Sequence, residues 1–282
     1  MKTKTMRVLA VHAHPDDEAI WTGGLLAHYA RQGAEVLVVT CTLGEEGEVI
    51  GEPYAQLTVD HANQLGGFRI AELYESLNHL GVQGHHLGGA GHFRDSGMAG
   101  TPAAANPRAF VNNGAEAVDL LVDVIDCFEP DLLVTYGPDG GYGHPDHIQA
   151  HKITHAAAEK AQHKARAILW AVTSREALDA SLAEVTEYPD GWRWAPEEIA
   201  AVDSYDLALE LASEVYEAKI AAMKAHATQV WIADGTSTIV NPEPAVGLGP
   251  DVVWALSNLI TQTVVRQEYY QIGYGTWNFE EK

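Results

Sequence analysis

The sequence has little cysteine, few basic residues and no long apolar run. Only Cys41 and Cys127 occur among the 282 residues, and each lies in or beside an apolar segment. We therefore expect two buried thiols rather than a disulfide, and neither cysteine has a Cys or His partner at metal-ligand spacing. No run approaches the ~20 apolar residues that a membrane-spanning helix needs. The polar start of the chain lacks a signal-peptide pattern, which predicts a cytoplasmic location.

Basic residues are scarce relative to acidic ones. Lys and Arg number 17 against 39 Asp and Glu, which gives a formal charge of −22. Phosphate binding needs clustered Lys and Arg, so this balance argues against a nucleic-acid partner, an anionic membrane partner or a metallophosphatase. A negative surface favours the capture of cations. Nothing in the composition indicates the oligomeric state.

Short β-rich runs alternate with helical patterns along the first 173 residues. We predict strands at 7–11, 35–42, 82–87, 131–136 and 167–172, and helices at 18–31, 57–80, 114–128 and 146–164. Strands that alternate with helices form βαβ units. The pattern therefore predicts an α/β fold with a mostly parallel sheet and helices on both faces.

The alternation fades after Ser174. A helix is predicted at 205–227, and strands at 229–240 and 262–275 would form a smaller C-terminal layer. No linker is clear, so we predict a single domain over 1–282, with a lobe at 1–173 and a C-terminal extension of open role at 174–282. Gly-rich segments at 44–54 and 88–113 each follow a strand, and we expect them to form walls of a substrate pocket.

Two clusters of His and Asp follow predicted buried strands. One reads His12-Ala13-His14-Pro15-Asp16-Asp17-Glu18, and the other reads Tyr142-Gly143-His144-Pro145-Asp146-His147. In an open parallel sheet such strand ends meet in one crevice, where ligands bind. The two clusters therefore predict a single site.

His14, Asp17 and His147 are the predicted metal ligands. Two imidazoles and one carboxylate leave a coordination position open, as in catalytic zinc sites. Fe²⁺ suits the same ligands.

Other polar residues of the two clusters suit acid–base chemistry. Asp16 is the predicted general base for an attacking water, and His144 is expected to act as a cationic electrophile or general acid. Tyr142, on a loop between glycines, could donate a hydrogen bond to a developing oxyanion. Asp146 could orient an imidazole and tune its pKa.

The sequence fits a metal-dependent enzyme better than it fits two other kinds of protein. A non-catalytic carbohydrate- or metal-binding protein has no need of a base such as Asp16 or an acid such as His144. The glycines at 88–91 lack the GxGxxG spacing of a dinucleotide site. The remaining histidines are expected to be core or surface residues.

The string Ala13-His14-Pro15-Asp16-Asp17-Glu18, together with His144-Pro145-Asp146-His147, resembles the LmbE/PIG-L family of zinc-dependent de-N-acetylases. The resemblance extends over most of the chain, including Ala225-His226-Ala227-Thr228-Gln229. Longer strings within 41–67 and 87–101 resemble the members of this family that act in mycothiol biosynthesis. One departure is Ala19, where the family commonly has Ser; the lysine typical of the related conjugate amidases is absent from this stretch.

The resemblance implies a Rossmann-like lobe and the removal of acetate from N-acetylglucosaminyl-inositol. It assigns metal ligation to His14, Asp17 and His147 and the general base to Asp16, and it supports His144 and Tyr142 as transition-state stabilisers. It further implies substrate contacts by Arg69, Asp95 and Glu48. Cleavage of mycothiol S-conjugates or of another N-acyl sugar is the alternative activity, and either Asp16 or His144 could protonate the departing amine.

Overall fold

The computed structural model describes residues 5–279. The helices are α1 (Asp17–Arg31), α2 (Leu65–Leu80), α3 (Gly114–Phe128), α4 (Pro145–Lys160), α5 (Arg175–Ala183) and α6 (Ser213–Ala225), with short 3₁₀ helices η1 (Glu52–Leu57), η2 (Pro102–Ala105), η3 (Phe110–Asn112) and η4 (Pro196–Glu198). The strands are β1 (Arg7–His12), β2 (Glu35–Thr40), β3 (Gln83–His86), β4 (Leu132–Tyr136), β5 (Ala167–Val172), β6 (Leu207–Glu210), β7 (Trp231–Ile232), β8 (Val252–Ala255), β9 (Gln262–Val264) and β10 (Gln267–Gly275).

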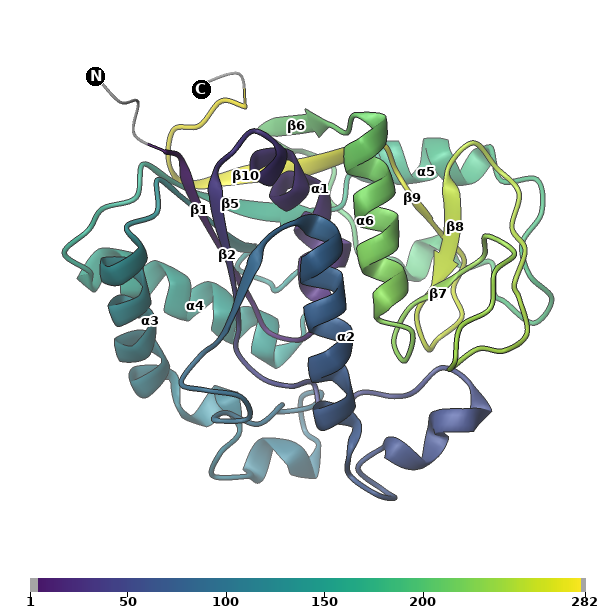
Figure 1. Ribbon diagram of the computed structural model, residues 1–282, viewed down its shortest axis with the longest axis horizontal. Coiled ribbons are helices and arrows are strands. Elements are labelled where there is room, and N and C mark those ends of the chain that lie inside the picture. The colour runs from purple at the N-terminus through teal and green to yellow at the C-terminus, as the bar shows by residue number, and fades with distance from the viewer. Residues whose placement is uncertain (1–4, 280–282) are drawn as a thin grey trace.

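A seven-stranded sheet runs through the centre of the molecule (Figure 1). Its order is β3-β2-β1-β4-β5-β10-β6, and the first five of these strands are parallel. β10 pairs antiparallel with both β5 and β6. The predicted α/β fold with a mostly parallel sheet is confirmed.

Helices cover both faces of this sheet. α1, α2 and α6 pack on one face, and α3 and α4 pack on the other. Successive side chains of β1 divide between the two cores, because neighbouring residues of a strand point to opposite faces. Val8 and Ala10 belong to the first core, whereas Leu9 and Val11 belong to the second, and all four are fully buried.

β1 and β4 lie side by side at the point where the chain changes direction across the sheet. After β1 the chain continues to β2 and β3 on one side, and it later returns to β4 and β5 on the other. Such a switch point opens a crevice at the carboxyl ends of the strands. Both His/Asp clusters follow these two strands, so the topology brings them together.

The C-terminal residues both complete the main sheet and build a smaller one. β7, β8 and β9 form a separate antiparallel sheet, so a smaller layer is present as predicted. Of the strand predicted at 262–275, however, only β9 belongs to it, because β10 joins the main sheet. Trp192, Ala233, Ala245, Val253 and Ala255 form a small core of their own behind the smaller sheet.

A buried ion pair joins the C-terminal residues to α1. Lys219 of α6 lies 2.5 Å from Glu268 of β10 and donates to the carbonyl of Ile20. The Glu268 carboxylate also accepts the main-chain N–H groups of Gly24 and Leu25, both at 2.7 Å. A Cβ on Gly24 would lie 2.8 Å from this carboxylate, so the close approach requires glycine.

The prediction of a helix at 205–227 was wrong at its start. Leu207–Glu210 is strand β6, and the helix begins only at Ser213. Leu207 and Leu211 fit a helical spacing, but Leu209 also faces inward, and residues 207–210 pair with β10. An available sheet edge decided between the two patterns.

Several other boundaries also differ from the prediction. α2 begins at Leu65 instead of residue 57, and of the predicted strand at 229–240 only Trp231–Ile232 is formed. α5 and β8 were not predicted. Cys41 is buried, but Cys127 is exposed, so the expectation of two buried thiols was wrong although neither forms a disulfide. No helix within residues 5–279 is long and apolar enough to cross a membrane.

Candidate active site and metal centre

The turn from β1 to α1 presents the first cluster. The Asp17 carboxylate accepts the main-chain N–H of His14 at 2.9 Å, which closes the turn on itself. Asp16 has a φ of 114°, a conformation that residues other than glycine rarely adopt. Pro15 precedes this residue, and α1 starts directly after it. The tight turn aims both His14 and Asp17 towards β4.

The turn from β4 to α4 presents the second cluster. His144 is the N-cap of α4, and its Nδ1 accepts the main-chain N–H of Asp146 at 3.2 Å. Pro145 occupies the first helical position, where its missing N–H costs nothing. Gly140 has a positive φ of 70°, and a Cβ there would lie 2.8 Å from the Cβ of His147. The glycine therefore lets the loop pass close over His147.

His14, Asp17 and His147 meet in one place. His14 Nδ1 lies 3.3 Å from His147 Nε2, and Asp17 Oδ2 lies 3.4 Å from His14 Nδ1. The other Asp17 oxygen lies 3.4 Å from His147 Nε2. Bonds of about 2.0–2.1 Å at tetrahedral angles place ligand atoms roughly 3.3–3.4 Å apart. Each pair of these side chains therefore has the separation of two ligands of one zinc ion, but the two contacts of Asp17 use different carboxylate oxygens.

The outer nitrogen of each imidazole faces an oxygen. His147 Nδ1 lies 3.0 Å from the carbonyl of Gly140, and His14 Nε2 lies 3.4 Å from Asp146 and 3.6 Å from Asp95. When these outer nitrogens carry protons, the inner nitrogens present lone pairs to each other. Two lone pairs at 3.3 Å need a proton or a cation between them, as at a metal centre with ordered outer partners.

The charges around His14 also favour a cation. Burial would lower the pKa of His14, but Asp95, Asp146 and Asp17 raise it well above its usual value. Burial would raise the pKa of Asp17, but His147 and His14 hold it well below its usual range. The buried Oδ1 of Asp146 has no hydrogen-bond partner. Three carboxylates around one imidazole thus favour a protonated His14 or a bound cation at this position.

Among the described residues, two triplets have ligand atoms close enough to share a cation; His14 belongs to both and Asp17 to neither. His14, His144 and His147 offer ligand atoms that all lie within 4.8 Å of one another, and so do His14, Asp95 and Asp146. His144 Nδ1 is already used by the main chain of Asp146, which makes it a weaker ligand than His147. A His/Asp group able to hold a metal is therefore present.

Asp16 lies beside the cluster in contact with Arg69. The guanidinium of Arg69 is 3.1 Å from the Asp16 carboxylate, and it also donates to the carbonyls of Pro15 and Gly44. Burial raises the pKa of Asp16 to about 6, although Arg69 lowers it. A carboxylate that titrates near neutral pH is suited to act as a base.

His144 and Tyr142 flank the opposite side of the cavity. Burial, His14 and His147 lower the pKa of His144 to about 3, so the expected cationic form is disfavoured at neutral pH. Since Nδ1 is an acceptor, the neutral ring carries its proton on Nε2. Burial and Asp17 raise the pKa of the Tyr142 hydroxyl well above its usual range, although the residue as a whole is half exposed. Both groups are therefore neutral hydrogen-bond donors.

A cavity of about 520 Å³ lies over these residues. Asp16, Arg69, Asp95, Tyr142, His144 and Glu48 all line it, so all three residues implied as substrate contacts are at its wall. Glu46–Glu48 and Asp95–Met98 come from the Gly-rich segments predicted as pocket walls. The far wall is more apolar and comes from the C-terminal residues, among them Leu178, Ile199 and Leu256.

Sequence reasoning missed a buried group directly behind Asp16. Glu18 lies 2.6 Å from His226 Nε2 and accepts the hydroxyl of Ser76 at 2.5 Å, and all three are fully buried. Glu18 also accepts the main-chain N–H of Asp16 at 3.0 Å. The late string that contains His226 was a signal of similarity, but the prediction placed His226 among the core or surface residues.

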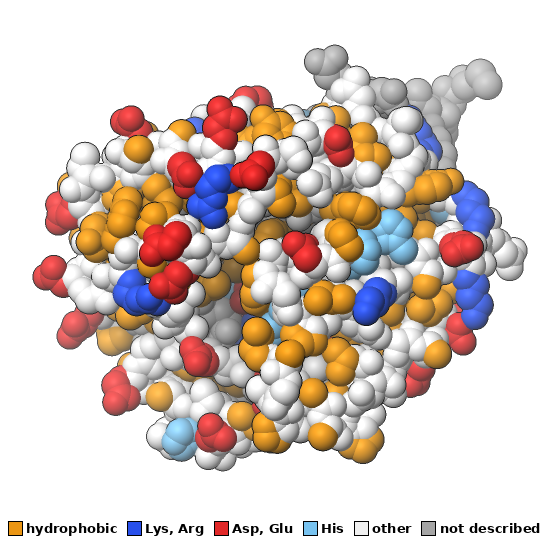
Figure 2. Space-filling model, turned by 180° about the vertical axis from the view of Figure 1, so that it is seen from behind, with side chains coloured by type: hydrophobic (Ala, Val, Ile, Leu, Met, Phe, Trp, Pro, Cys, Tyr) orange, Lys and Arg blue, Asp and Glu red, His pale blue; other side chains and the backbone are white. Residues whose placement is uncertain are grey.

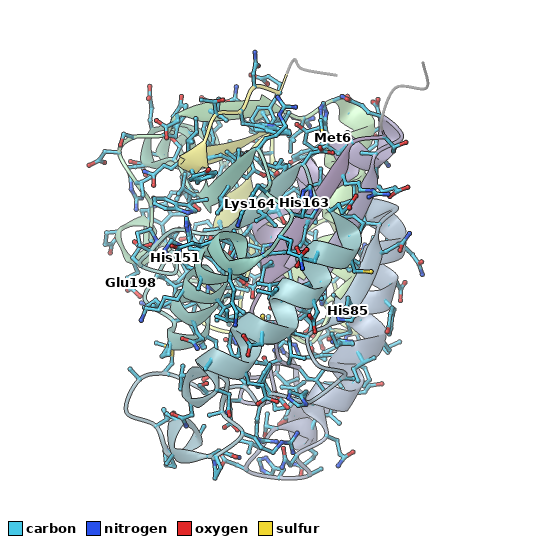
Figure 3. The ribbon with its side chains drawn as sticks, turned by 90° about the vertical axis from the view of Figure 1, so that its left-hand side faces the viewer. Met6, His85, His151, His163, Lys164 and Glu198 are labelled. Atoms are coloured by element: carbon cyan, nitrogen blue, oxygen red, sulfur yellow. The ribbon has the colours of Figure 1, made fainter. Side chains whose placement is uncertain are left out.

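Three other histidines come from different elements: His85 from β3, His151 from α4 and His163 from the segment after α4. Figure 3 shows His85, His151 and His163 well separated from one another. His151 and His163 lie close to main-chain carbonyls, of Tyr136 at 2.9 Å and of Pro130 at 2.7 Å. On the face shown in Figure 2, acidic side chains are spread among fewer Lys and Arg.

The family and the proteins that this chain is similar to are named as deacetylases. The sequence pattern of the family described as "GlcNAc-PI de-N-acetylase" (PIG-L) matches residues 9–158. The 1D-myo-inositol 2-acetamido-2-deoxy-alpha-D-glucopyranoside deacetylase of Corynebacterium glutamicum (strain R) is 58% identical over 273 residues, which cover 96% of this chain and 92% of that protein.

Two solved structures share the fold. A deacetylase of the teicoplanin biosynthesis pathway has a TM-score of 0.53 and 26% identity, and the match covers 79% of this chain and 84% of that one. The N,N'-diacetylchitobiose deacetylase of Pyrococcus horikoshii has a TM-score of 0.54 and 17% identity, over 80% of this chain and 71% of that one. By sequence and by fold, this chain belongs to the PIG-L (LmbE) family of de-N-acetylases.

Proposed function

We propose that this chain is a metal-dependent hydrolase that removes acetate from 1D-myo-inositol 2-acetamido-2-deoxy-alpha-D-glucopyranoside in mycothiol biosynthesis. The substrate is taken from the name of the Corynebacterium relative. The observation that carries the chemistry is the approach of His14 Nδ1 to His147 Nε2 at 3.3 Å, with Asp17 completing the set and Asp16 beside it. One cation and one base at a cavity wall suit the hydrolysis of an amide.

We assign metal ligation to His14, Asp17 and His147. Zinc is the proposed ion, with Fe²⁺ as the alternative that the same ligands accept. A bound dication would supply Lewis acidity at the acetamide oxygen and lower the pKa of water. Asp146 and Asp95 hold the outer nitrogen of His14 and so fix the orientation of this ring.

Asp16 is the proposed base that takes a proton from the attacking water. Its pKa of about 6 leaves it ionised at neutral pH yet basic enough to accept that proton. Nε2–H of His144 and the hydroxyl of Tyr142 then donate to the oxygen on which negative charge develops. Because His144 is neutral at this pH, the proton gained by Asp16 is the one we assign to the departing amine.

The three residues proposed to contact the substrate differ in how many of their hydrogen-bonding positions are already used within the protein. Arg69 already donates to two carbonyls and contacts Asp16. Asp95 accepts the N–H groups of Gly97 and Glu46 at 2.8 and 3.2 Å. Glu48 is exposed at the cavity wall. We therefore propose Glu48 as the carboxylate with most capacity to bind sugar hydroxyls, with Arg69 and Asp95 contributing their remaining positions.

Cleavage of mycothiol S-conjugates is the second candidate activity. The apolar far wall at Leu178, Ile199 and Leu256 favours it, since such a wall can accept a group larger than a hydroxylated ring. The arrangement as a single domain over 1–282, with a lobe at 1–173 and an extension at 174–282, and the cytoplasmic location remain predictions.

The test is an assay of acetate and free amine with purified protein that is chelated and then reloaded with Zn²⁺ or, without air, Fe²⁺. We expect no release after chelation, recovery with metal, and faster cleavage of N-acetylglucosaminyl-inositol than of an S-conjugate. The rate should fall on the acid side with a midpoint near pH 6 as Asp16 becomes protonated. Release that survives chelation, or a preference for the conjugate, would contradict this proposal.

A further inference from the structure

Asp16 has a backbone conformation that must be held in place. Its φ of 114° and ψ of −32° lie outside the regions that a residue with a Cβ adopts readily. Such a conformation is unfavourable and persists only where its surroundings fix it. The direction of the Asp16 side chain follows from this backbone. What holds the backbone therefore also aims the carboxylate.

The carboxylate of Glu18 bonds directly to this strained residue. One oxygen, Oε2, accepts the main-chain N–H of Asp16 at 3.0 Å. The other, Oε1, lies 2.5 Å from Ser76 Oγ and 2.6 Å from His226 Nε2. Ser76 comes from α2, and His226 directly follows α6. Three elements distant in sequence thus converge on one carboxylate that touches Asp16.

We propose that Glu18 is a positioning residue which, held by His226 and Ser76, fixes the main chain of Asp16 so that the Asp16 carboxylate faces the reacting water. This inference rests on the proposed function, because it concerns the base of that reaction. Glu18 itself is fully buried and does not line the cavity. It therefore acts through Asp16 and not on the substrate.

The composition of this group argues for positioning over simple packing. Burying a carboxylate and an imidazole costs solvation, and apolar residues of the same volume often stabilise a fold equally well or better. A hydrogen-bond acceptor, however, is the only kind of group that can hold the N–H of Asp16. Arg69 holds the same turn from the other side, through the carbonyl of Pro15 and the Asp16 carboxylate.

The first test compares two substitutions at Glu18. E18M fills a similar volume without an acceptor, and E18Q keeps an oxygen that can accept the N–H of Asp16. We expect E18M to lower kcat by about 100-fold, the loss typical of a reacting group misplaced by ~1 Å. KM should change less than about threefold and the bound metal per chain should stay unchanged, because no ligand is altered. E18Q should restore kcat to within about fivefold of the wild type.

Thr228→Val is the matched control. Thr228 follows His226 by two residues, and its main-chain N–H and its hydroxyl donate to Glu72 of α2 at 2.8 and 2.6 Å. T228V removes only the hydroxyl bond, and this contact does not reach Asp16. We expect T228V to lower the melting temperature about as much as E18M does, with kcat within about twofold of the wild type. H226Q leaves the first turn of α1 intact and is the second variant, with an expected loss of about tenfold in kcat.

Amide exchange gives a readout that does not depend on turnover. In the wild type the Asp16 N–H should exchange slowly, and in E18M it should exchange at least about 10-fold faster, as seen by NMR of ¹⁵N-labelled protein. Wild-type kcat in E18M, an equal kcat loss in T228V, or unchanged exchange at Asp16 would each overturn the proposal. The wild type could release no acetate while E18M still loses protection of the Asp16 amide. In that case the proposed function is wrong, but the proposal that Glu18 fixes the main chain of Asp16 is supported.

Discussion

Residues 5–173 and residues 174–279 meet at the same cavity but contribute different kinds of side chain. The first part supplies the His/Asp cluster from the turns after β1 and β4, at the carboxyl ends of parallel strands. The second part supplies the more apolar wall at Leu178, Ile199 and Leu256. It also supplies Lys219 and Glu268, which bind main-chain groups of α1. The reactive groups thus come from residues 5–173, whereas residues 174–279 form the apolar wall of the cavity and bind the main chain of α1.

This division has a physical cause. Parallel strands aim several turns into one crevice, which suits a precise constellation of ligands and bases. Such a constellation works only if its supporting groups are fixed by packing and hydrogen bonds. The C-terminal strands provide that support, because β10 lies beside β5 and brings Glu268 to the main-chain N–H groups of α1. Substitutions in the two parts should therefore have different consequences.

Loss of a ligand should have the largest effect. Asp17→Ala removes the carboxylate that lies 3.4 Å from both imidazoles, so we expect bound metal and acetate release to fall to background. Elemental analysis and the acetate assay measure this. Asp119→Ala, an exposed residue of α3, is the control and should retain both. Full metal content in D17A would remove Asp17 from the ligand set.

Asp16→Asn should separate the base from the ligands. We expect kcat to fall by about 10³-fold, within the range for a lost general base, while bound metal stays unchanged. Loss of metal in D16N would mean that the base and ligand assignments must be exchanged.

The same substitution should stabilise the metal-free protein. The pKa of Asp16 rises from 3.8 to about 6 in the folded state, so its ionised form is disfavoured by folding. The cost is fully present above about pH 6 and disappears below about pH 4, with an upper value of about 3 kcal/mol. Chelated D16N should therefore melt at a higher temperature than chelated wild type at pH 8 and at a similar one at pH 4. A lower melting temperature at pH 8 would contradict this sign.

Lys219→Met should act on stability rather than chemistry. It leaves the buried Glu268 without its ion-pair partner, which typically costs about 3–5 kcal/mol of unfolding free energy. Chemical denaturation measures this, and kcat of the folded fraction should change less than about fivefold. Lys224→Met on the same helix breaks a more exposed pair with Asp234 and should cost less than about 1 kcal/mol. Equal losses of unfolding free energy in the two variants would show that the buried Lys219–Glu268 pair stabilises the fold no more than the exposed pair does.

Tyr142→Phe should slow turnover without affecting the metal. Removing one donor to an oxyanion raises the barrier by about 2.7–4 kcal/mol, which corresponds to about 10²–10³-fold in kcat. The substitution keeps the ring that contacts His147 and alters no proposed ligand, so metal content should stay unchanged. Unchanged turnover would remove Tyr142 from the scheme.

Leu256→Ala should have the smallest effect. It enlarges the C-terminal wall of the cavity without touching any polar group, so we expect KM to rise by about tenfold or less, with kcat unchanged. Steady-state kinetics on the N-acetyl sugar and on an S-conjugate would show whether this wall discriminates between them. A large fall in kcat would mean that the C-terminal part takes part in the chemistry.

Much of the fold followed from local pattern. The helix at 114–128 and the strand at 167–172 were predicted with the bounds that the structure has, because both are strongly periodic or β-rich and end at clear breaks. The strand at 207–210 was not predicted, because its leucines fit helical spacing as well and only pairing with β10 decides between the two. Local pattern is weakest where a sheet edge competes with a helix.

The sequence by itself determined the residue types of the site. The strings at 12–18 and 142–147 named two imidazoles, several carboxylates and a tyrosine at strand ends, and hence a metal and a base. Only the tertiary structure decided their arrangement: the approach of His14 to His147, the neutral state of His144 and the strained main chain of Asp16. The physical reason is that His226, Lys219 and Glu268 reach the first helix from more than 190 residues away, and no local pattern encodes such contacts.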